Sequence, residues 1–317
     1  MVFLFQKDKL SFFEQVVDGL IIFGIMMAIG TYIQFFISPT IFGLTYNDIY
    51  GQDLSERVNI TKRAISFISS PQSLALFLAI TSILSLKIKN IMKKLSVFLF
   101  ISTAGVLTFS KVFILIIFSY FLFYRLSKLT FKNFIVFILI LIVFVFLISE
   151  LSNTNRAFEI FNILLNITQH VTFLVWMDFL NYDTTFLQVI FGHGLGLVSR
   201  AAQSYGNYHI LNGSAESFLL QIYFEIGLVG LILFLILFIN AFIKYIKLKQ
   251  YKHYAVLLIS LFPCLLGTPA FYGLTSGFIL SFFIVASVFV SKKNKQYRAI
   301  KSIWDEKTVK PSGIVSG

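Results

Sequence analysis

The side chains best suited to chemistry gather in one stretch of the sequence, residues 151–239. This stretch holds Arg156, the glycine cluster Gly192-His193-Gly194-Leu195-Gly196, Arg200, His209 and, at the start of an apolar helix, Glu216. Arginine binds phosphate oxygens in bidentate fashion, and a carboxylate at a helix N-terminus is stabilised by the first-turn N–H groups. The stretch therefore has the groups needed to hold an anion and to take a proton from a hydroxyl.

The glycine cluster does not predict a nucleotide site. It follows no strand-like segment, and the Lys-Ser/Thr pair of a phosphate-binding loop does not come after it. Glycines at alternate positions favour a tight backbone turn, so His193 is either part of that turn or a ligand or base. The single cysteine, Cys264, lies in an apolar run, and no His-Glu-x-x-His motif occurs. We therefore expect no metal and no cofactor.

The composition is that of a membrane protein. The chain is 57% hydrophobic and 17% aromatic, and only 13% of its residues are charged. Soluble domains carry about 25% charged residues, and long apolar runs bounded by lysines indicate transmembrane helices. In such a chain the net charge of +12 sets the membrane orientation, so we do not expect binding to nucleic acid.

The hydropathy pattern predicts an all-α integral membrane protein with about eight transmembrane helices in one domain, residues 1–291. The predicted spans cover about residues 16–37, 71–86, two within 95–124, 134–149, 217–243 and two within 254–290. Two long outward loops, about 39–70 and 150–216, connect them. Residues 292–317 are predicted to be a basic cytoplasmic tail.

The distribution of Lys and Arg assigns the two sides. With both termini in the cytoplasm, 20 of the 26 Lys and Arg residues lie inside, as the positive-inside rule requires. The others lie outside: Arg57, Lys62, Arg63, Lys111, Arg156 and Arg200. A cation that opposes the rule needs another reason to be there, and an anionic ligand at the outer surface provides one. The alternatives are a solvated loop face for Arg57, Lys62 and Arg63, and harmless snorkelling for Lys111.

Two carboxylates near the last outward loop have different expected roles. Glu216 precedes an apolar helix, so it is either an N-terminal cap or a general base toward a hydroxyl. Glu225 lies further along the same helix. An ionised carboxylate at membrane depth is costly unless it is paired or faces a polar cavity. We expect Glu225 to pair with an outer-loop cation or to lie beside a break at Gly227 and Gly230.

Four segments, in this order, resemble the bacterial O-antigen polymerase and ligase family. They are Arg63-Ala-Ile-Ser-Phe-Ile-Ser-Ser-Pro71-Gln-Ser-Leu-Ala75, Thr108-Phe-Ser110-Lys111, Asn155-Arg156 followed by Phe191-Gly-His-Gly-Leu-Gly196, and Glu216-Ser-Phe-Leu-Leu-Gln-Ile-Tyr-Phe-Glu-Ile-Gly-Leu-Val-Gly230. The chain departs from the family pattern at Ser66, where glycine is usual, at Ile68, where phenylalanine is usual, and at Lys111, where arginine is usual. Glu216 favours the polymerase type, because ligases more typically place His-Asn there.

The resemblance implies a metal-independent, multi-pass glycosyltransferase of the Wzy type with a GT-C-like fold. Such a polymerase, in the bacterial cytoplasmic membrane, transfers polysaccharide repeat units from undecaprenyl pyrophosphate to a lipid-linked acceptor hydroxyl at the outer face. On this analogy the pyrophosphate is bound by Arg63, Arg156, Lys111 and Arg200. Glu216, with His209 as the alternative base, activates the acceptor. A chain-length regulator and a flippase are further expected partners. A ligase, or a transporter of the same lipid-linked sugar, stays open as an alternative.

Overall fold

The computed structural model describes residues 9–38, 66, 71–108, 110–126, 177, 184–194, 217–248, 251–267 and 277–289. Every regular element in this part of the chain is a helix, which confirms the all-α prediction there. The elements are α2 (Lys9–Tyr32) continued by the π-helical turn η1 (Ile33–Ile37), α5 (Pro71–Ser85), α6 (Ile91–Val106), α7 (Lys111–Leu126), α11 (Phe186–Phe191), α13 (Phe218–Lys247), α14 (Lys252–Gly267) and a further helix, Gly277–Phe289.

Helices lie at most of the positions predicted as spans. Within 95–124 there are two helices, α6 and α7, joined by a short turn, and within 254–290 there are α14 and Gly277–Phe289. The predicted span 134–149 and the tail at 292–317 lie outside the described residues, as do nearly all residues of the two outward loops.

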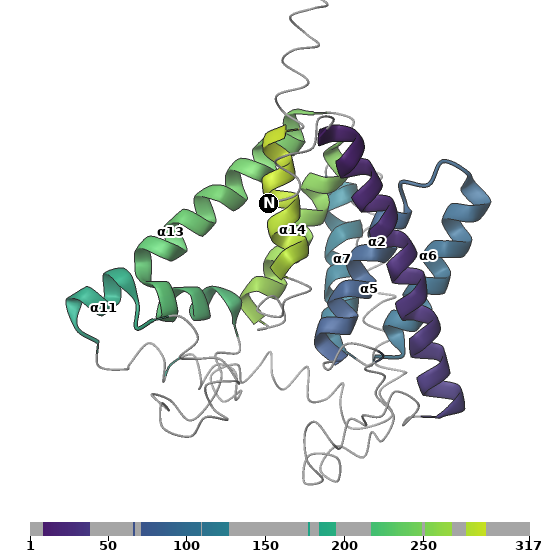
Figure 1. Ribbon diagram of the computed structural model, residues 1–317, viewed down its shortest axis with the longest axis horizontal. Helices are drawn as coiled ribbons and strands as arrows, with labels where there is room; N and C mark the ends of the chain where they lie inside the picture. The colour runs from purple at the N-terminus through teal and green to yellow at the C-terminus, as the bar shows by residue number, and fades with distance from the viewer. Residues whose placement is uncertain are drawn as a thin grey trace, which may run out of the picture.

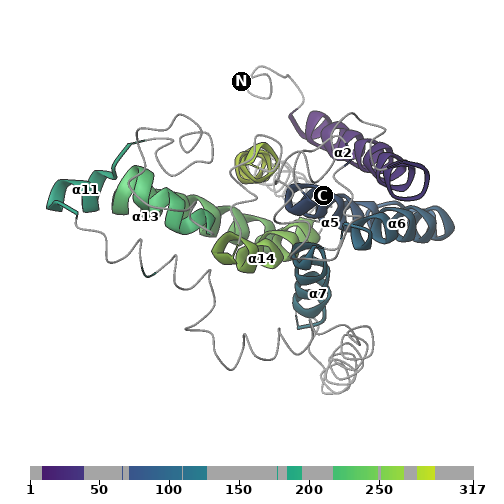
Figure 2. The same ribbon diagram turned by 90° about the horizontal axis from the view of Figure 1, so that it is seen from below.

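The central helix is α5, which contacts α2, α6 and α7 (Figures 1 and 2). Almost every side chain from Pro71 to Ser85 is buried. A helix that is apolar on all sides is expected in such a surrounded position. On the other side of α7 the bundle continues through α14, and α13 packs on α14.

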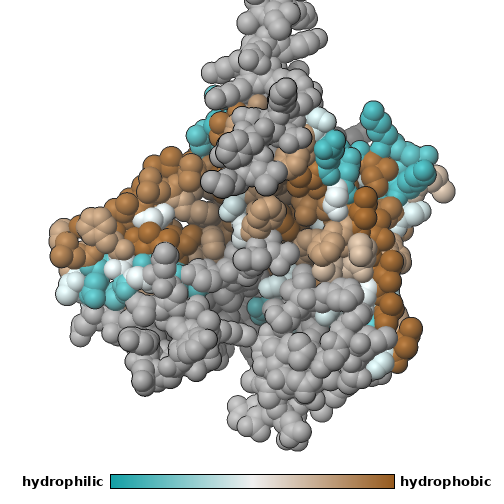
Figure 3. Space-filling view, viewed as in Figure 1, coloured by the Kyte–Doolittle hydropathy of each residue, from teal (hydrophilic) through white to brown (hydrophobic). Residues whose placement is uncertain are grey.

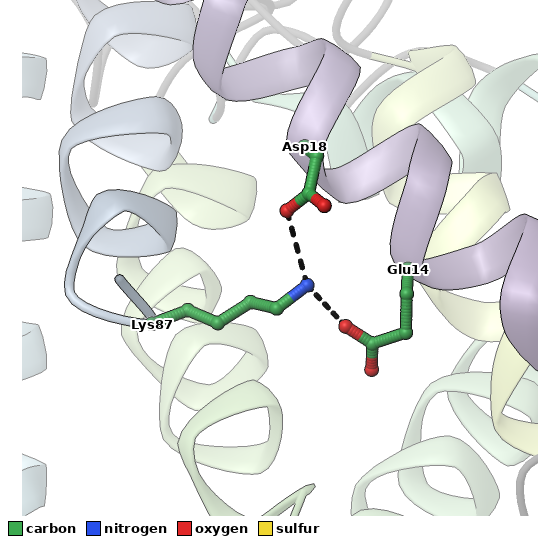
Figure 4. A network of polar contacts seen from close by, with 3 residues as sticks. All are labelled: Glu14, Asp18 and Lys87. Carbon is green, nitrogen blue, oxygen red and sulfur yellow. Dashed lines mark hydrogen bonds and ion pairs between the residues drawn. The ribbon is translucent and has the colours of Figure 1, made fainter. Parts of the chain in front are cut away.

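One end of the bundle, which we call the Lys87 end, is joined by ion pairs and aromatic rings. Lys87 follows α5 and forms ion pairs with Glu14 and Asp18 of α2, its Nζ atom lying 3.2 Å from Asp18 Oδ1 (Figure 4). The Phe13 ring centroid lies 5.2 Å from that of Tyr254, in the first turn of α14. The start of α2, the end of α5 and the start of α14 therefore meet at this end.

The opposite end, which we call the Gln34 end, holds the last turns of α2 and α14. Gln34 Oε1 accepts a hydrogen bond of 2.7 Å from the Ser66 N–H. The Tyr32 hydroxyl donates to the Phe100 carbonyl at 2.8 Å, so the end of α6 lies there too. The turn between α6 and α7 follows directly, which places Lys111 at the Gln34 end. The other described Lys and Arg residues lie toward the Lys87 end: Lys9, Lys87, Lys89, Lys93, Lys94, Arg125, Lys244, Lys247 and Lys252.

Two helical segments are long and apolar enough to cross a membrane by length and composition, Ser11–Ile37 and Phe218–Lys247. The apolar side chains of the second are largely uncovered: Leu233 and Ile236 are each 56% exposed. Figure 3 shows hydrophobic surface over α13 and along α2, with hydrophilic residues gathered near the start of α6. The molecule therefore presents apolar flanks and a polar Lys87 end.

Candidate functional site

The helix α13 is broken at Gly227, whose φ of 77° and ψ of −172° are not helical. In Figure 1 the two halves of α13 meet at a bend beside α11. The second half, residues 228–247, is about 30 Å long at the rise of an α-helix, which equals the thickness of a bilayer core. The helix predicted as a span over about 217–243 is therefore present as Phe218–Lys247, with the expected break at Gly227 inside it.

The glycine cluster caps the broken end of the first half of α13. The N–H groups of His193 and Gly194 donate to the carbonyl oxygens of Phe224 and Glu225, at 2.9 and 3.1 Å. In an unbroken helix those carbonyls accept from residues 228 and 229. The His193 ring also stacks on Phe224, with centroids 4.1 Å apart. His193 Nδ1 lies 3.2 Å from the Phe224 carbonyl oxygen, the distance at which a protonated Nδ1 donates to it.

The glycine cluster thus forms a tight backbone turn, as the alternate glycines predict. Gly192 has a φ of +80°, and a β-carbon there would lie 2.5 Å from the backbone nitrogen of Ile226. Only glycine adopts this backbone conformation at so close an approach. The preceding helix α11 is fixed by a capping box between Thr185 and Gln188. The turn is consequently held in place by α11 before it and by the backbone of α13 against which it packs.

The same helix anchors both ends of the segment 195–216. Gly194, before the segment, is bonded to Glu225. Ser217, after it, is the N-cap of α13: its hydroxyl accepts from the Leu220 N–H at 3.3 Å and donates to the Leu265 carbonyl at 3.3 Å. Eight helical residues separate the two anchors, a distance of about 12 Å. Since Leu265 lies in the last turns of α14, these anchors are at the Gln34 end.

Most predicted site residues lie outside the described part of the chain. This holds for the expected catalytic residues Glu216 and His209, and for Arg63, Arg156 and Arg200 among the expected pyrophosphate ligands. The described anchors bracket three of them, because Arg200, His209 and Glu216 belong to the segment 195–216. The structure thereby relates their segment to α13 without giving their positions.

Lys111 is the predicted site residue that the structure does describe. It is exposed and is the first residue of α7, at the end where helix N–H groups favour anions. The preceding turn is built by buried side chains: the Thr108 hydroxyl donates to the Gly105 carbonyl at 2.7 Å and accepts from the Ser110 N–H at 3.3 Å. Thr108 and Ser110 therefore shape the turn and leave the charge of Lys111 accessible.

Ser66 has a backbone conformation that favours glycine. Its φ is +46°, a left-handed conformation that glycine adopts without strain, and its side chain is buried. Besides the bond to Gln34, its hydroxyl lies 3.4 Å from the Met27 carbonyl oxygen. The residue three positions after Arg63 is thus fastened to α2 at the Gln34 end.

Two buried amide side chains were not among the site residues predicted from the sequence. Gln34 and Gln221 are each 3% exposed. The available signal for Gln221 was its spacing of four from Ser217 and Glu225 within an otherwise apolar segment. Glu225, 2% exposed, lies two residues before the break, as expected. Among the described residues, no group of three or more His, Cys, Asp or Glu side chains could hold a metal ion.

Comparison with known families, curated proteins and solved structures finds no match for this chain.

Proposed function

We propose that the protein is a membrane glycosyltransferase that polymerises polysaccharide repeat units carried on undecaprenyl pyrophosphate. It acts at the outer face of the bacterial cytoplasmic membrane, with both termini in the cytoplasm, and its multi-pass fold is GT-C-like. The polymer is an O-antigen or a capsule. The partners are the lipid-linked oligosaccharides, the bilayer, a chain-length regulator and a flippase.

A bilayer location is supported by the surface of α13. Its second half is about as long as a bilayer core is thick, and several of its apolar side chains are more than half exposed. A buried helix of a soluble protein would cover these side chains, whereas lipid tails solvate them. The lysines at the Lys87 end agree with a cytoplasmic position for that end.

The observation that supports the proposal is that the described parts of the motif segments all lie toward the Gln34 end of the bundle. Ser66 of the first motif is bonded to α2 there, Lys111 is exposed there, and the glycine cluster and Ser217 anchor the segment 195–216 there. Segments far apart in sequence are thus brought to one side of the bundle. Cationic side chains and a carboxylate that come from different segments can act on one substrate only if these segments lie on the same side of the bundle.

The proposed reaction is a single displacement at the anomeric carbon of the donor sugar. The acceptor hydroxyl forms the new glycosidic bond as its proton passes to Glu216, or to His209 as the alternative base. The bond between the anomeric carbon and the phosphate oxygen breaks, and undecaprenyl pyrophosphate leaves. Arg63, Arg156, Lys111 and Arg200 offset the charge of the departing pyrophosphate. This leaving group drives the reaction, so no nucleotide is needed.

The position of the helix break argues against a transporter. Transporters bind their substrates near the midplane, between paired discontinuous helices. The break at Gly227 lies instead about 30 Å along α13 from its Lys-bearing end. In the proposed orientation this distance corresponds to the outer boundary of the bilayer core, not to its midplane. A polar site at that level suits chemistry on a lipid-linked headgroup.

Glycan analysis of a deletion strain, complemented with the wild-type gene, tests the proposal. The expected result is loss of long chains, with single repeat units still attached to the surface acceptor, and recovery on complementation. Loss of all surface glycan would indicate a ligase or a transporter instead. Unchanged long chains would refute a role in polymerisation.

A further inference from the structure

Helices α6 and α7 meet along an exposed apolar surface. The Phe98 and Phe121 rings are in edge contact, with centroids 6.0 Å apart. On α6, Ile91 and Leu95 are more than half exposed, and on α7 Phe121 is 41% exposed. Residues four or seven positions apart share one side of a helix, so Ile91 and Leu95 continue the apolar surface along α6 beside the ring contact. In the proposed membrane location, lipid tails cover such side chains.

Two cations lie at the Lys87 end of this surface. Lys94 precedes Phe98 by four residues, and Arg125 follows Phe121 by four. Because α6 and α7 run in opposite directions from the turn that joins them, both cations lie about one helical turn beyond the ring contact, toward the Lys87 end. Lys94 is partly buried and Arg125 is exposed. Each helix therefore brings one cation to the same end of one apolar surface.

In the part of the chain that the structure describes, no carboxylate pairs with either cation. The ion pairs there all belong to Lys87. The sequence holds no Asp or Glu within residues 57–149, so no neighbour in sequence supplies a countercharge. Lys94 also lies in the first turn of α6, where the helix dipole disfavours a cation and no acidic residue is present. An anion bound from outside the chain would offset this charge.

The combination of charge and apolar surface selects an anionic phospholipid. A phosphodiester accepts charge-assisted hydrogen bonds from Lys and Arg, and basic side chains between helices on the cytoplasmic side are suited to anionic headgroups. The acyl chains would cover the apolar side chains beside the headgroup, which a free phosphate would leave uncovered. Figure 3 shows hydrophilic surface at the start of α6 adjoining hydrophobic surface. In the proposed orientation this level is that of the cytoplasmic headgroups.

We propose that Lys94 and Arg125 bind the headgroup phosphate of an anionic phospholipid in the cytoplasmic leaflet, and that Ile91, Leu95 and Phe121 contact its acyl chains. The inference rests on the membrane location in the proposed function and not on the polymerase reaction. A lipid bound here bridges α6 and α7 at the end opposite to the turn that joins them, and so stabilises the pair.

The test is lipid binding by the full-length protein in a non-ionic detergent, followed by native mass spectrometry. The protein is titrated with phosphatidylglycerol or with phosphatidylcholine of the same acyl chains. The test variant is Lys94→Gln/Arg125→Gln. Lys93→Gln/Lys247→Gln is the matched control, because it removes two exposed lysines at the Lys87 end. Lys93 lies two turns before Phe100, whose ring packs on α2, so it is on the side of α6 away from α7.

We expect the wild type to bind phosphatidylglycerol about tenfold more tightly than phosphatidylcholine. The test variant should bind phosphatidylglycerol about twentyfold more weakly, or about fivefold for each cation, and the control should change by less than about twofold. If the test variant does not fold, raised salt should weaken phosphatidylglycerol binding to the wild type and leave phosphatidylcholine binding unchanged.

Equal affinity of the wild type for the two lipids would overturn the site, and so would equal losses in the two double variants. Because this measurement needs no polymerisation, the two proposals fail separately. Loss of the lipid preference leaves the glycan phenotype of the deletion strain untouched. Unchanged long chains in that strain would overturn the polymerase and leave the lipid site standing.

Discussion

Gly227 packs directly on the backbone of Gly192: a β-carbon on Gly227 would lie 2.5 Å from the Gly192 nitrogen. This contact joins the broken helix α13 to the end of α11. It fixes the bend and holds the anchors of the segment 195–216 at the Gln34 end. The contact has two requirements, a positive φ at both residues and no side chain at either.

The first prediction concerns this contact. Gly227→Ala should lower the free energy of unfolding by about 2–4 kcal/mol, because alanine is strained at a φ of +77° and its methyl group meets backbone atoms. The measurement is thermal unfolding of the detergent-solubilised protein. Gly19→Ala is the control, since a β-carbon there meets nothing within 4 Å. Equal melting temperatures for the two variants would contradict the tight packing of Gly192 on Gly227.

The second prediction concerns the orientation. A cysteine placed at exposed Lys111 should react with a membrane-impermeant maleimide added outside the cytoplasmic membrane, whereas a cysteine at exposed Lys89 should react only after the membrane is opened. The native Cys264 is buried, so the wild-type chain should give a low background. The reverse labelling pattern would invert the topology and remove the proposed outer-face reaction.

The third prediction concerns Ser66. Ser66→Val should destabilise the protein by about 1–2 kcal/mol, because a β-branched residue is disfavoured at a φ of +46°. Ser66→Gly, which removes the side chain from this left-handed position, should keep or raise stability. Activity should fall in the valine variant as well, since Ser66 fastens the segment that carries Arg63. A valine variant as stable as wild type would show that this conformation is not required.

How far the sequence predicts this structure depends on the type of signal. Hydropathy and lysine placement predict the helices and their order, because α5 and the pair α6 and α7 are local apolar runs with clear ends. The break at Gly227 is only suggested by the sequence, since its cause is a backbone contact with Gly192, far away in the chain. The burial of Gln221 and the bond from Ser66 to Gln34 likewise depend on tertiary packing, which no local pattern encodes.

The fourth prediction concerns the pyrophosphate. Lys111→Ala should raise the KM for the lipid-linked donor by about five- to tenfold, the loss expected for one charge-assisted hydrogen bond. Lys111→Arg should retain or improve donor binding, because guanidinium binds phosphate in bidentate fashion. Lys93→Ala, an exposed lysine at the Lys87 end, is the control and should leave KM unchanged. Equal effects at Lys93 and Lys111 would indicate a general surface-charge effect and would remove Lys111 from the site.

The fifth prediction separates the two candidate bases. Glu216→Gln keeps the shape of the side chain and removes its ability to take a proton, so kcat should fall by about a hundredfold or more while the donor KM changes little. His209→Gln should then retain most of the activity. Polymerisation is measured with the lipid-linked repeat unit, and membrane insertion is checked by the yield of intact protein. If His209→Gln is the inactive variant and Glu216→Gln polymerises normally, the base is His209, and Glu216 serves only as an N-terminal group of α13.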